Sequence, residues 1–190
     1  MICHSPSKID TMSWVIWVTG LPGCGKTTVS ERARELLLEK NINVKILQLD
    51  KIRKVITPNP KYSEEERDIV YSALSYMALL LYEEGINVII DATANRRRYR
   101  NLARDLISDF SEIYLICSLE SCVKREEKRS AEYAPKDIYK RSKSKEASVP
   151  GVNVAYEEPE SPELVIDSEV LGIDESAALA VNWIINNLQF

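Results

Sequence analysis

Short runs of apolar and β-branched residues alternate along the chain with longer segments of helical periodicity. The apolar runs predict strands at residues 14–19, 44–49, 87–90, 112–117 and 164–166. The periodic segments predict helices near residues 26–40, 63–84, 97–108, 119–129 and 175–187. This alternation is typical of a parallel sheet covered by helices on both faces. We therefore expect an α/β fold with three layers, α/β/α, around a five-stranded parallel sheet.

The segment 63–84 carries the clearest helical signals. Ser63 and Glu66 have the spacing of a capping box at its start. Apolar residues then recur at helical spacing, and we expect them to form one buried stripe: Ile69, Val70, Ala73, Leu74, Met77, Ala78 and Leu81.

A length of 190 residues fits one domain. Residues 1–11 are polar and turn-forming, so we expect a flexible tail there and a single domain over residues 12–190. Residues 125–150 are rich in Lys and Arg and poor in large apolar residues, which predicts a basic, mobile lid.

Composition restricts the partners and the compartment. A net charge of −4 and a pI near 5.3 argue against a general polyanion-binding surface. The four cysteines form no CxxC pair, so we expect buried thiols rather than a zinc or dithiol site. No signal peptide begins the chain, and no apolar stretch reaches the roughly 20 residues of a membrane-spanning helix. These features predict a cytoplasmic protein with no membrane partner.

The strongest motif follows the first predicted strand and leads into the first predicted helix. Gly20, Gly25, Lys26 and Thr27 match GxxxxGK[ST], the P-loop pattern, in the strand–loop–helix context that it requires. Glycines let successive N–H groups turn toward a phosphate, while the lysine bridges the β- and γ-phosphates and the Thr27 hydroxyl binds Mg²⁺. The residues expected to bind ATP are Gly20, Leu21, Pro22, Gly23, Cys24, Gly25, Lys26, Thr27 and Thr28.

The P-loop establishes the ligand class but not the reaction. The chain has no NKxD-type run and no apolar strand ending in DxxG, which disfavours a GTPase. It is also short for an ATPase that couples hydrolysis to movement. A small kinase remains, in which closure of the basic lid excludes water from the phosphoryl group.

Polar residues follow the predicted strands at the sheet edge where ligands bind in this architecture. Asp50 would accept a hydrogen bond or proton from the acceptor hydroxyl, and Arg53 would pair with an anionic group of the acceptor. A solvated Asp and Arg at a helix start is the alternative. Asp91 would position Mg²⁺ through water, or else act as a helix cap or structural hydrogen-bond partner.

Two basic groups are candidates for contacts with bound phosphates. Residues 96–100 hold four arginines at a helix start, and we take Arg97 as the candidate for the substrate anion. From the lid, we expect Arg125 to bring the cation that stabilises charge in transit and so to act in catalysis with Lys26 and Asp50.

Four runs in order resemble adenylyl-sulfate (APS) kinases: residues 20–28, residues 47–53 (LQLDKIR), residues 137–141 (DIYKR) and residues 156–164 (YEEPESPEL). The resemblance covers about residues 12–168. It implies transfer of the ATP γ-phosphate to the 3′-hydroxyl of adenosine 5′-phosphosulfate, with Mg²⁺, in sulfate assimilation. It also implies a homodimer, which is common in this family.

The chain departs from the family pattern at four places, one of which is an interruption of the lid run Arg-Asp-Pro-Lys-Gly-Leu-Tyr. Gln48 and Leu49 replace the first Asp and the Gly of Leu-Asp-Gly-Asp-x-x-Arg, and residues 94–97 replace Ser-Pro-Tyr-Arg. Val149 stands where the family has a phenylalanine whose ring stacks on the adenine of APS.

Two alternatives remain open from the sequence. The run DATAN at residues 91–95 also resembles P-loop kinases that act on small alcohols, polynucleotide ends or aminoacyl-tRNA. The other alternative is a regulator that binds nucleotide without turnover.

Overall fold

The computed structural model describes residues 13–128, 133, 135, 137–142 and 147–188. The tail predicted at residues 1–11 lies outside this part of the chain. A five-stranded parallel sheet forms the middle layer, in the order β2-β3-β1-β4-β5. Its strands are β1 (Val15–Thr19), β2 (Val44–Gln48), β3 (Asn87–Asp91), β4 (Phe110–Ile116) and β5 (Leu164–Asp167).

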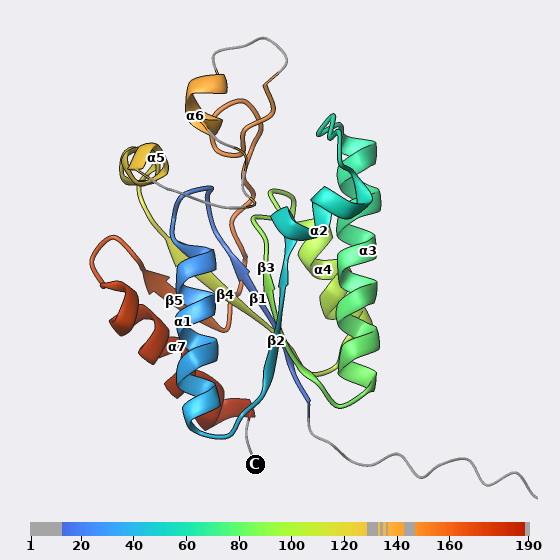
Figure 1. Cartoon of the computed structure of the whole chain (residues 1–190), viewed down its shortest axis with the longest axis vertical. Coiled ribbons are helices and arrows are strands. Elements are labelled where there is room, and N and C mark those ends of the chain that lie inside the picture. Colours follow the sequence, from blue (N-terminus) through green and yellow to red (C-terminus); the bar gives the residue numbers. More distant parts are fainter. Residues whose placement is uncertain (1–12, 129–132, 134, 136, 143–146, 189–190) are drawn as a thin grey trace, which may run out of the picture.

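Helices cover both faces of the sheet (Figure 1). One face carries α1 (Lys26–Glu39) and α7 (Ile173–Leu188), and the other carries α3 (Glu64–Glu83) and α4 (Arg97–Leu106). The expected three-layer α/β/α fold is therefore confirmed.

The central strand β1 explains why the core divides into two clusters. All five of its residues are buried because β3 and β4 pair with it on either side. Successive side chains of a strand point to opposite faces. Ile16 and Val18 accordingly pack in the cluster under α1 and α7, while Val15 and Trp17 pack in the cluster under α3 and α4.

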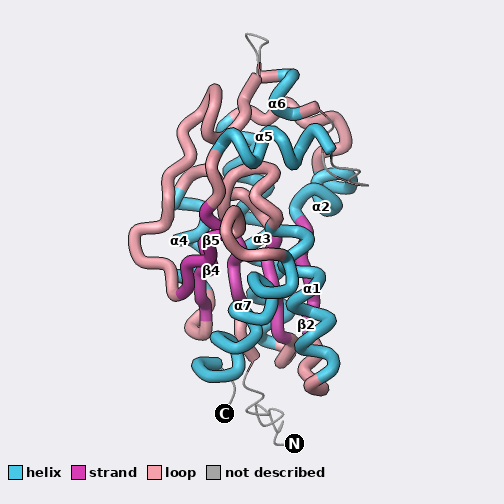
Figure 2. Tube along the Cα trace, turned by 90° about the vertical axis from the view of Figure 1, so that its left-hand side faces the viewer, coloured by secondary structure: helices cyan, strands magenta, loops and turns pink. Residues whose placement is uncertain are grey.

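Three further helices gather at the end of the sheet where the strands finish (Figure 2). They are α2 (Leu49–Ile56), α5 (Leu119–Lys128) and α6 (Ile138–Arg141). Among the described residues, no helix combines the length and apolar character needed to cross a bilayer.

Helix α2 corrects the predicted end of the second strand. Leu49 was expected to close that strand, but it begins α2 and is buried together with Arg53, one turn further on. Both side chains lie on one face because residues separated by four positions share a side of a helix. This helix and the four-residue α6 were not among the predicted helices, because segments this short show little helical periodicity.

The expected apolar stripe on α3 is only partly correct. Val70, Leu74 and Ala78 are buried, but Ile69 is 63% exposed. The buried face runs through Arg67 instead, because its spacing of three and seven residues from Val70 and Leu74 places it on the side facing the sheet.

Candidate active site

The P-loop connects β1 to α1 and has the backbone that its glycines predict. Gly20, Gly23 and Gly25 all have positive φ angles, of 147°, 84° and 102°. A Cβ atom at Gly20 would lie 2.6 Å from the carbonyl oxygen of Leu115, and one at Gly23 would lie 2.5 Å from that of Cys122. Both positions therefore exclude any side chain, and the loop delivers the chain directly into the N-terminus of α1.

Lys26 is the first residue of α1 and lies across the loop. Its Nζ donates hydrogen bonds to the carbonyl oxygens of Gly20, at 3.0 Å, and Leu21, at 2.9 Å. The side chain is buried, so these bonds satisfy an ammonium group that would otherwise be costly to bury. They hold a positive charge at the helix N-terminus, where backbone N–H groups and the helix dipole also favour an anion.

Thr27 and Asp91 meet beside this lysine. The Thr27 hydroxyl donates a 2.6 Å hydrogen bond to Oδ2 of Asp91, the last residue of β3. Burial raises the pKa of Asp91 to about 6, against the opposing effects of Lys26 and the Thr27 hydrogen bond. The described residues hold no cluster of three or more His, Cys, Asp or Glu side chains suited to a metal. A hydroxyl and one carboxylate fit Mg²⁺, which takes few protein ligands and completes its shell with water and phosphate oxygens.

A cavity of about 1170 Å³ opens at the P-loop and extends in both directions along the sheet edge. Because β2 and β5 are the two outer strands, the loops that follow them lie on opposite sides of β1. Residues after β2 line what we call the β2 end: Asp50, Arg53, Tyr62 and Arg67. Residues after β5 line the β5 end: Leu171, Gly172, Ile173 and Ser176. The volume exceeds that of a typical single-ligand pocket, about 300–1,000 Å³.

The β2 end brings together the residues predicted for the acceptor. Asp50 and Arg53 both come from α2 and line the cavity. Arg53 is buried, pairs with Glu66 at 2.8 Å and lies 5.2 Å above the ring of Tyr62. The ion pair and the ring contact thus fix the direction of its guanidinium group.

Arg67 is a residue of this end that the sequence analysis did not identify. It is buried, and it donates to Oδ1 of Asn95 at 3.0 Å and to the carbonyl of Ser148 at 2.7 Å. Its signal in the sequence is positional, since a cation on the apolar stripe of α3 needs buried partners. Arg67 places a second guanidinium in the wall of the cavity, next to Arg53.

Arg97, which was expected to contact the substrate anion, lies apart from these residues. It does not line the cavity. Its Nε donates to the carbonyl of Glu158 at 2.7 Å, and its Nη1 pairs with Glu160 at 2.5 Å. The other arginines at the start of α4 are also paired: Arg96 with Glu64 and Glu157, Arg98 with Asp68, and Arg100 with Glu112. The acidic run at residues 157–163 thus contacts Arg96, Arg97 and Arg100, whereas Arg98 pairs with Asp68 of α3.

Arg125, in the last turn of α5, lines the cavity between the P-loop and the end of β5. Its Nη2 donates to the carbonyl of Ser168 at 2.6 Å, and its Nη1 lies 3.4 Å from the carbonyl of Cys24. Lys128 and Arg141 of the predicted lid also line the cavity. The remaining lid cations divide into Lys140, which pairs with Asp137, and Arg129, Lys136, Lys143 and Lys145, which lie outside the described residues.

Val149 is buried and lines the cavity beside Ser148. Aromatic rings are nevertheless present at the β2 end, where Tyr62 and Tyr133 line a side pocket of about 160 Å³ together with Asp50 and Arg53.

Comparison with known proteins places this arrangement in a family. The adenylylsulphate kinase family matches residues 12–167. The chain is 35% identical over 169 residues to a probable adenylyl-sulfate kinase of Pyrococcus abyssi, covering 88% of this chain and 92% of the relative. It is 36% identical over 159 residues to a probable adenylyl-sulfate kinase of Archaeoglobus fulgidus, covering 83% and 97%.

A solved structure agrees with this assignment. The Mycobacterium tuberculosis APS kinase CysC, in complex with AMPPNP and APS, superposes with a TM-score of 0.79 at 27% identity, over 90% of this chain and 97% of that one. Since the family match spans most of the chain and the relatives align over nearly their full lengths, this protein belongs to the adenylylsulphate kinase family.

Proposed function

We propose that this protein is an ATP-dependent adenylyl-sulfate kinase, which transfers the γ-phosphoryl group of ATP to the 3′-hydroxyl of adenosine 5′-phosphosulfate. One observation carries the proposal beyond family membership. A single cavity contains the P-loop between a β5 end and a β2 end, and the β2 end holds one carboxylate and two guanidinium groups. Those groups suit an acceptor with a hydroxyl to activate and an anionic phosphosulfate to bind.

The ATP triphosphate binds in the P-loop, along residues 20–28. Lys26 now donates to two carbonyl oxygens of the loop. When ATP binds, its β- and γ-phosphates replace these carbonyls as acceptors, and the ammonium group neutralises their charge. The adenine of ATP then extends toward the β5 end, where Leu171 and Ile173 offer apolar contact. Arg125 lies between this adenine and the P-loop.

The Thr27 hydroxyl and the Asp91 carboxylate would hold Mg²⁺, with water completing its shell. When bound, the ion would neutralise negative charge on the triphosphate. The 2.6 Å contact between the two side chains supports this role, because it brings a hydroxyl oxygen and a carboxylate oxygen together at the first turn of α1.

APS binds at the β2 end with its phosphosulfate toward Arg53 and Arg67. Its 3′-hydroxyl is directed to Asp50, which accepts the proton as the oxygen attacks the γ-phosphorus. A bond forms between that oxygen and phosphorus while the bond to the β–γ bridging oxygen breaks. The products are ADP and 3′-phosphoadenosine 5′-phosphosulfate. Lys26 and Arg125 stabilise the charge on the phosphoryl group during transfer.

A ring at the β2 end compensates for Val149 in binding the adenine of APS. Tyr62 lines both the main cavity and the side pocket, and its ring is held by Arg53 and Arg67, at 5.2 and 5.9 Å. A stacked base contributes about 1–3 kcal/mol.

Self-association and compartment are further parts of the proposal. Ile69, Tyr76 and Leu80 form an exposed apolar stripe on α3, with exposures of 63%, 57% and 45%. Spacings of seven and four residues place them on one face, which supports a homodimer. Light scattering of the purified protein tests this assembly, with a monomer mass as the contrary result. We retain the cytoplasm as the expected compartment.

The activity is tested by coupled ADP release with Mg·ATP and APS, beside one control without acceptor and another with a nucleic acid bearing a free 5′-hydroxyl. We expect ADP release that depends on APS, together with stoichiometric formation of 3′-phosphoadenosine 5′-phosphosulfate. Release with the nucleic acid but not with APS would assign the β2 end to a different hydroxyl.

A further inference from the structure

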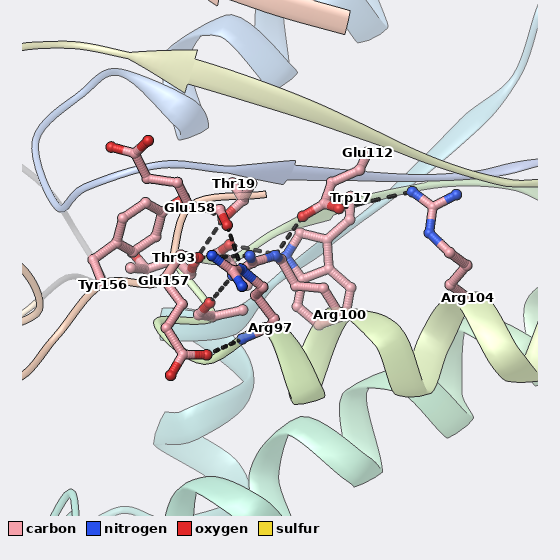
Figure 3. A network of polar contacts seen from close by, with 12 residues as sticks. Trp17, Thr19, Thr93, Arg97, Arg100, Arg104, Glu112, Tyr156, Glu157 and Glu158 are labelled. Carbon is pink, nitrogen blue, oxygen red and sulfur yellow. Dashed lines mark hydrogen bonds and ion pairs between the residues drawn. The ribbon is translucent and has the colours of Figure 1, made fainter. Parts of the chain in front are cut away.

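The segment that follows β3 is held by three side chains at three successive carbonyl groups (Figure 3). The carbonyls of residues 92, 93 and 94 accept hydrogen bonds from Trp17 Nε1, Thr19 Oγ1 and Arg100 Nη1, in that order. Trp17 and Thr19 belong to β1 and support the part of the segment next to Asp91. Arg100 comes from α4 and supports the part that continues toward residue 95.

Arg100 joins four parts of the fold through one guanidinium group. It is 1% exposed, and its Nε pairs with Glu112 of β4. Its Nη2 donates to the carbonyl of Glu157 at 2.7 Å, while its Nη1 reaches Ala94. Burial raises the pKa of Glu112, and the neighbouring Arg100 opposes that shift.

Ala94 needs this support because of its backbone conformation. Its φ angle is +43°, in the left-handed region that residues with a side chain rarely adopt. Its N–H donates to the Tyr71 hydroxyl at 3.0 Å, and its carbonyl is held by Arg100. The peptide groups on both sides of Ala94 are therefore fixed by buried side chains.

The turn at Ala94 determines where Asn95 points. Oδ1 of Asn95 accepts the 3.0 Å hydrogen bond from Arg67, and its Nδ2 donates to the carbonyl of Ala155 at 3.1 Å. Arg67 in turn lines the β2 end of the cavity and reaches Ser148. A continuous path of contacts thus runs from Arg100 through Ala94 and Asn95 to Arg67.

We propose that Arg100 is a positioning residue for the acceptor, which acts through Ala94 and Asn95 to orient Arg67 at the β2 end of the cavity. The proposal rests on the proposed function for the identity of the acceptor. It predicts an effect specific to the acceptor, because Trp17 and Thr19 continue to hold the carbonyls nearest Asp91 when Arg100 is changed.

Arg100→Lys tests the proposal, because lysine keeps the charge opposite Glu112 but has no planar fork to reach three acceptors. Arg104→Lys is the matched control. Arg104 also lies on α4 and pairs with Glu163 at 2.6 Å and Glu112 at 3.7 Å, but it bonds to no residue of the segment 92–95.

Initial rates are measured with APS varied at saturating ATP and with ATP varied at saturating APS, below the unfolding temperature of each variant. We expect Arg100→Lys to raise KM for APS about ten-fold or more, with KM for ATP within about two-fold of wild type. Arg104→Lys should change neither. Glu112→Gln removes the charge opposite Arg100 but keeps the shape of the Glu112 side chain. It should produce a smaller rise in KM for APS than Arg100→Lys.

A lower unfolding temperature with both KM values unchanged would show a purely structural ion pair and overturn the proposal. An equal rise in both KM values would also overturn it, since the effect would not belong to the acceptor end.

Amide hydrogen exchange separates this inference from the proposed function. If wild type shows no APS-dependent turnover, the proposed function fails. Amide exchange in the protein without ligands still tests the path of contacts from Arg100 through Ala94 and Asn95. Arg100→Lys should accelerate exchange at the amide of Ala94 and at that of Arg97, whose N–H donates to the carboxylate of Glu157, the residue whose carbonyl Arg100 holds. It should leave exchange at Val29, in α1, unchanged. Unaltered exchange at Ala94 and Arg97 would overturn the positioning role whatever the acceptor is.

Discussion

The hydroxyl of Thr27 donates a 2.6 Å hydrogen bond to the carboxylate of Asp91, joining the first turn of α1 to the end of β3. The parallel register of β1 and β3 pairs Val18 with Asp91, which brings that carboxylate level with the beginning of the P-loop. The proposed Mg²⁺ contacts thus depend on strand pairing rather than on nearness in the sequence.

Asp91→Asn should weaken the use of Mg²⁺ more than the binding of ATP itself. The amide cannot supply the negative charge that orders the water around the ion, so we expect the half-saturating Mg²⁺ concentration to rise about 10–100-fold. The measurement is initial rate against Mg²⁺ at saturating ATP and APS. An unchanged Mg²⁺ profile would exclude Asp91 from the metal site.

Lys26→Ala should abolish transfer. The substitution removes the only P-loop side chain that neutralises the β- and γ-phosphates, and we expect kcat to fall by at least about 10²–10³-fold. Circular dichroism and calorimetric titration with ATP accompany the assay. Substantial turnover by a folded Lys26→Ala protein would contradict the assigned role.

Asp50→Asn should lower kcat while leaving ATP affinity almost unchanged, because Asp50 lies at the β2 end and not in the P-loop. Loss of a positioned general base costs about 10²–10⁴-fold. The comparison requires kcat from steady-state rates and Kd for ATP from equilibrium titration. Full turnover with wild-type ATP affinity would remove Asp50 from catalysis.

Tyr62→Ala should raise KM for APS about 5–150-fold, the equivalent of the 1–3 kcal/mol contributed by a stacked base. Tyr62→Phe is the control, since it keeps the ring and removes only the hydroxyl. KM for APS should therefore change little in Tyr62→Phe. Equal KM values in wild type and Tyr62→Ala would mean that another group binds the adenine.

Glu157→Gln should lower the folding stability at neutral pH and make the stability fall less steeply as the pH is lowered. The N–H of Arg97 and the guanidinium of Arg96 both donate to the Glu157 carboxylate, at 2.9 Å each, and they lower the pKa of Glu157 from its usual 4.5. The native protein therefore binds this proton more weakly than the unfolded chain. Its contribution to stability is complete above the ordinary glutamate pKa and is lost as the pH falls through the lower native value.

Unfolding temperatures at pH 7 and at about pH 4 check this expectation. The difference in unfolding temperature between wild type and Glu157→Gln should become smaller as the pH falls. Glu120→Gln, which alters an exposed pair with Lys124, should match wild type at both pH values. A constant difference between wild type and Glu157→Gln would show that protonation of Glu157 is not linked to folding.

The regular elements were largely predictable because their signals are local. Apolar runs predicted all five strands, and capping at Ser63, where the hydroxyl accepts from the N–H of Glu66, begins the helix expected there. The missed helices are α2, which has only eight residues, and α6, which has only four. Ile69 was predicted to be buried but is exposed on α3, because the apolar residues of this segment are compatible with more than one helical stripe.

The arginines mark the limit of that local information. Arg97 lies in an arginine-rich run at a helix start, which is a typical setting for an anion-binding residue. It nevertheless donates hydrogen bonds to Glu158 and Glu160, which are more than sixty positions away in the sequence. Arg67 has no motif in the sequence and still reaches the cavity, through Asn95 and Ser148.

By itself, the sequence determined the P-loop, the strand–helix order and the family resemblance, because a contiguous motif carries its backbone geometry with it. The tertiary structure alone decided which charged side chains face the cavity. A guanidinium binds whichever carboxylates or carbonyls folding brings within a few ångströms, and for Arg67 and Arg97 those partners come from distant parts of the chain.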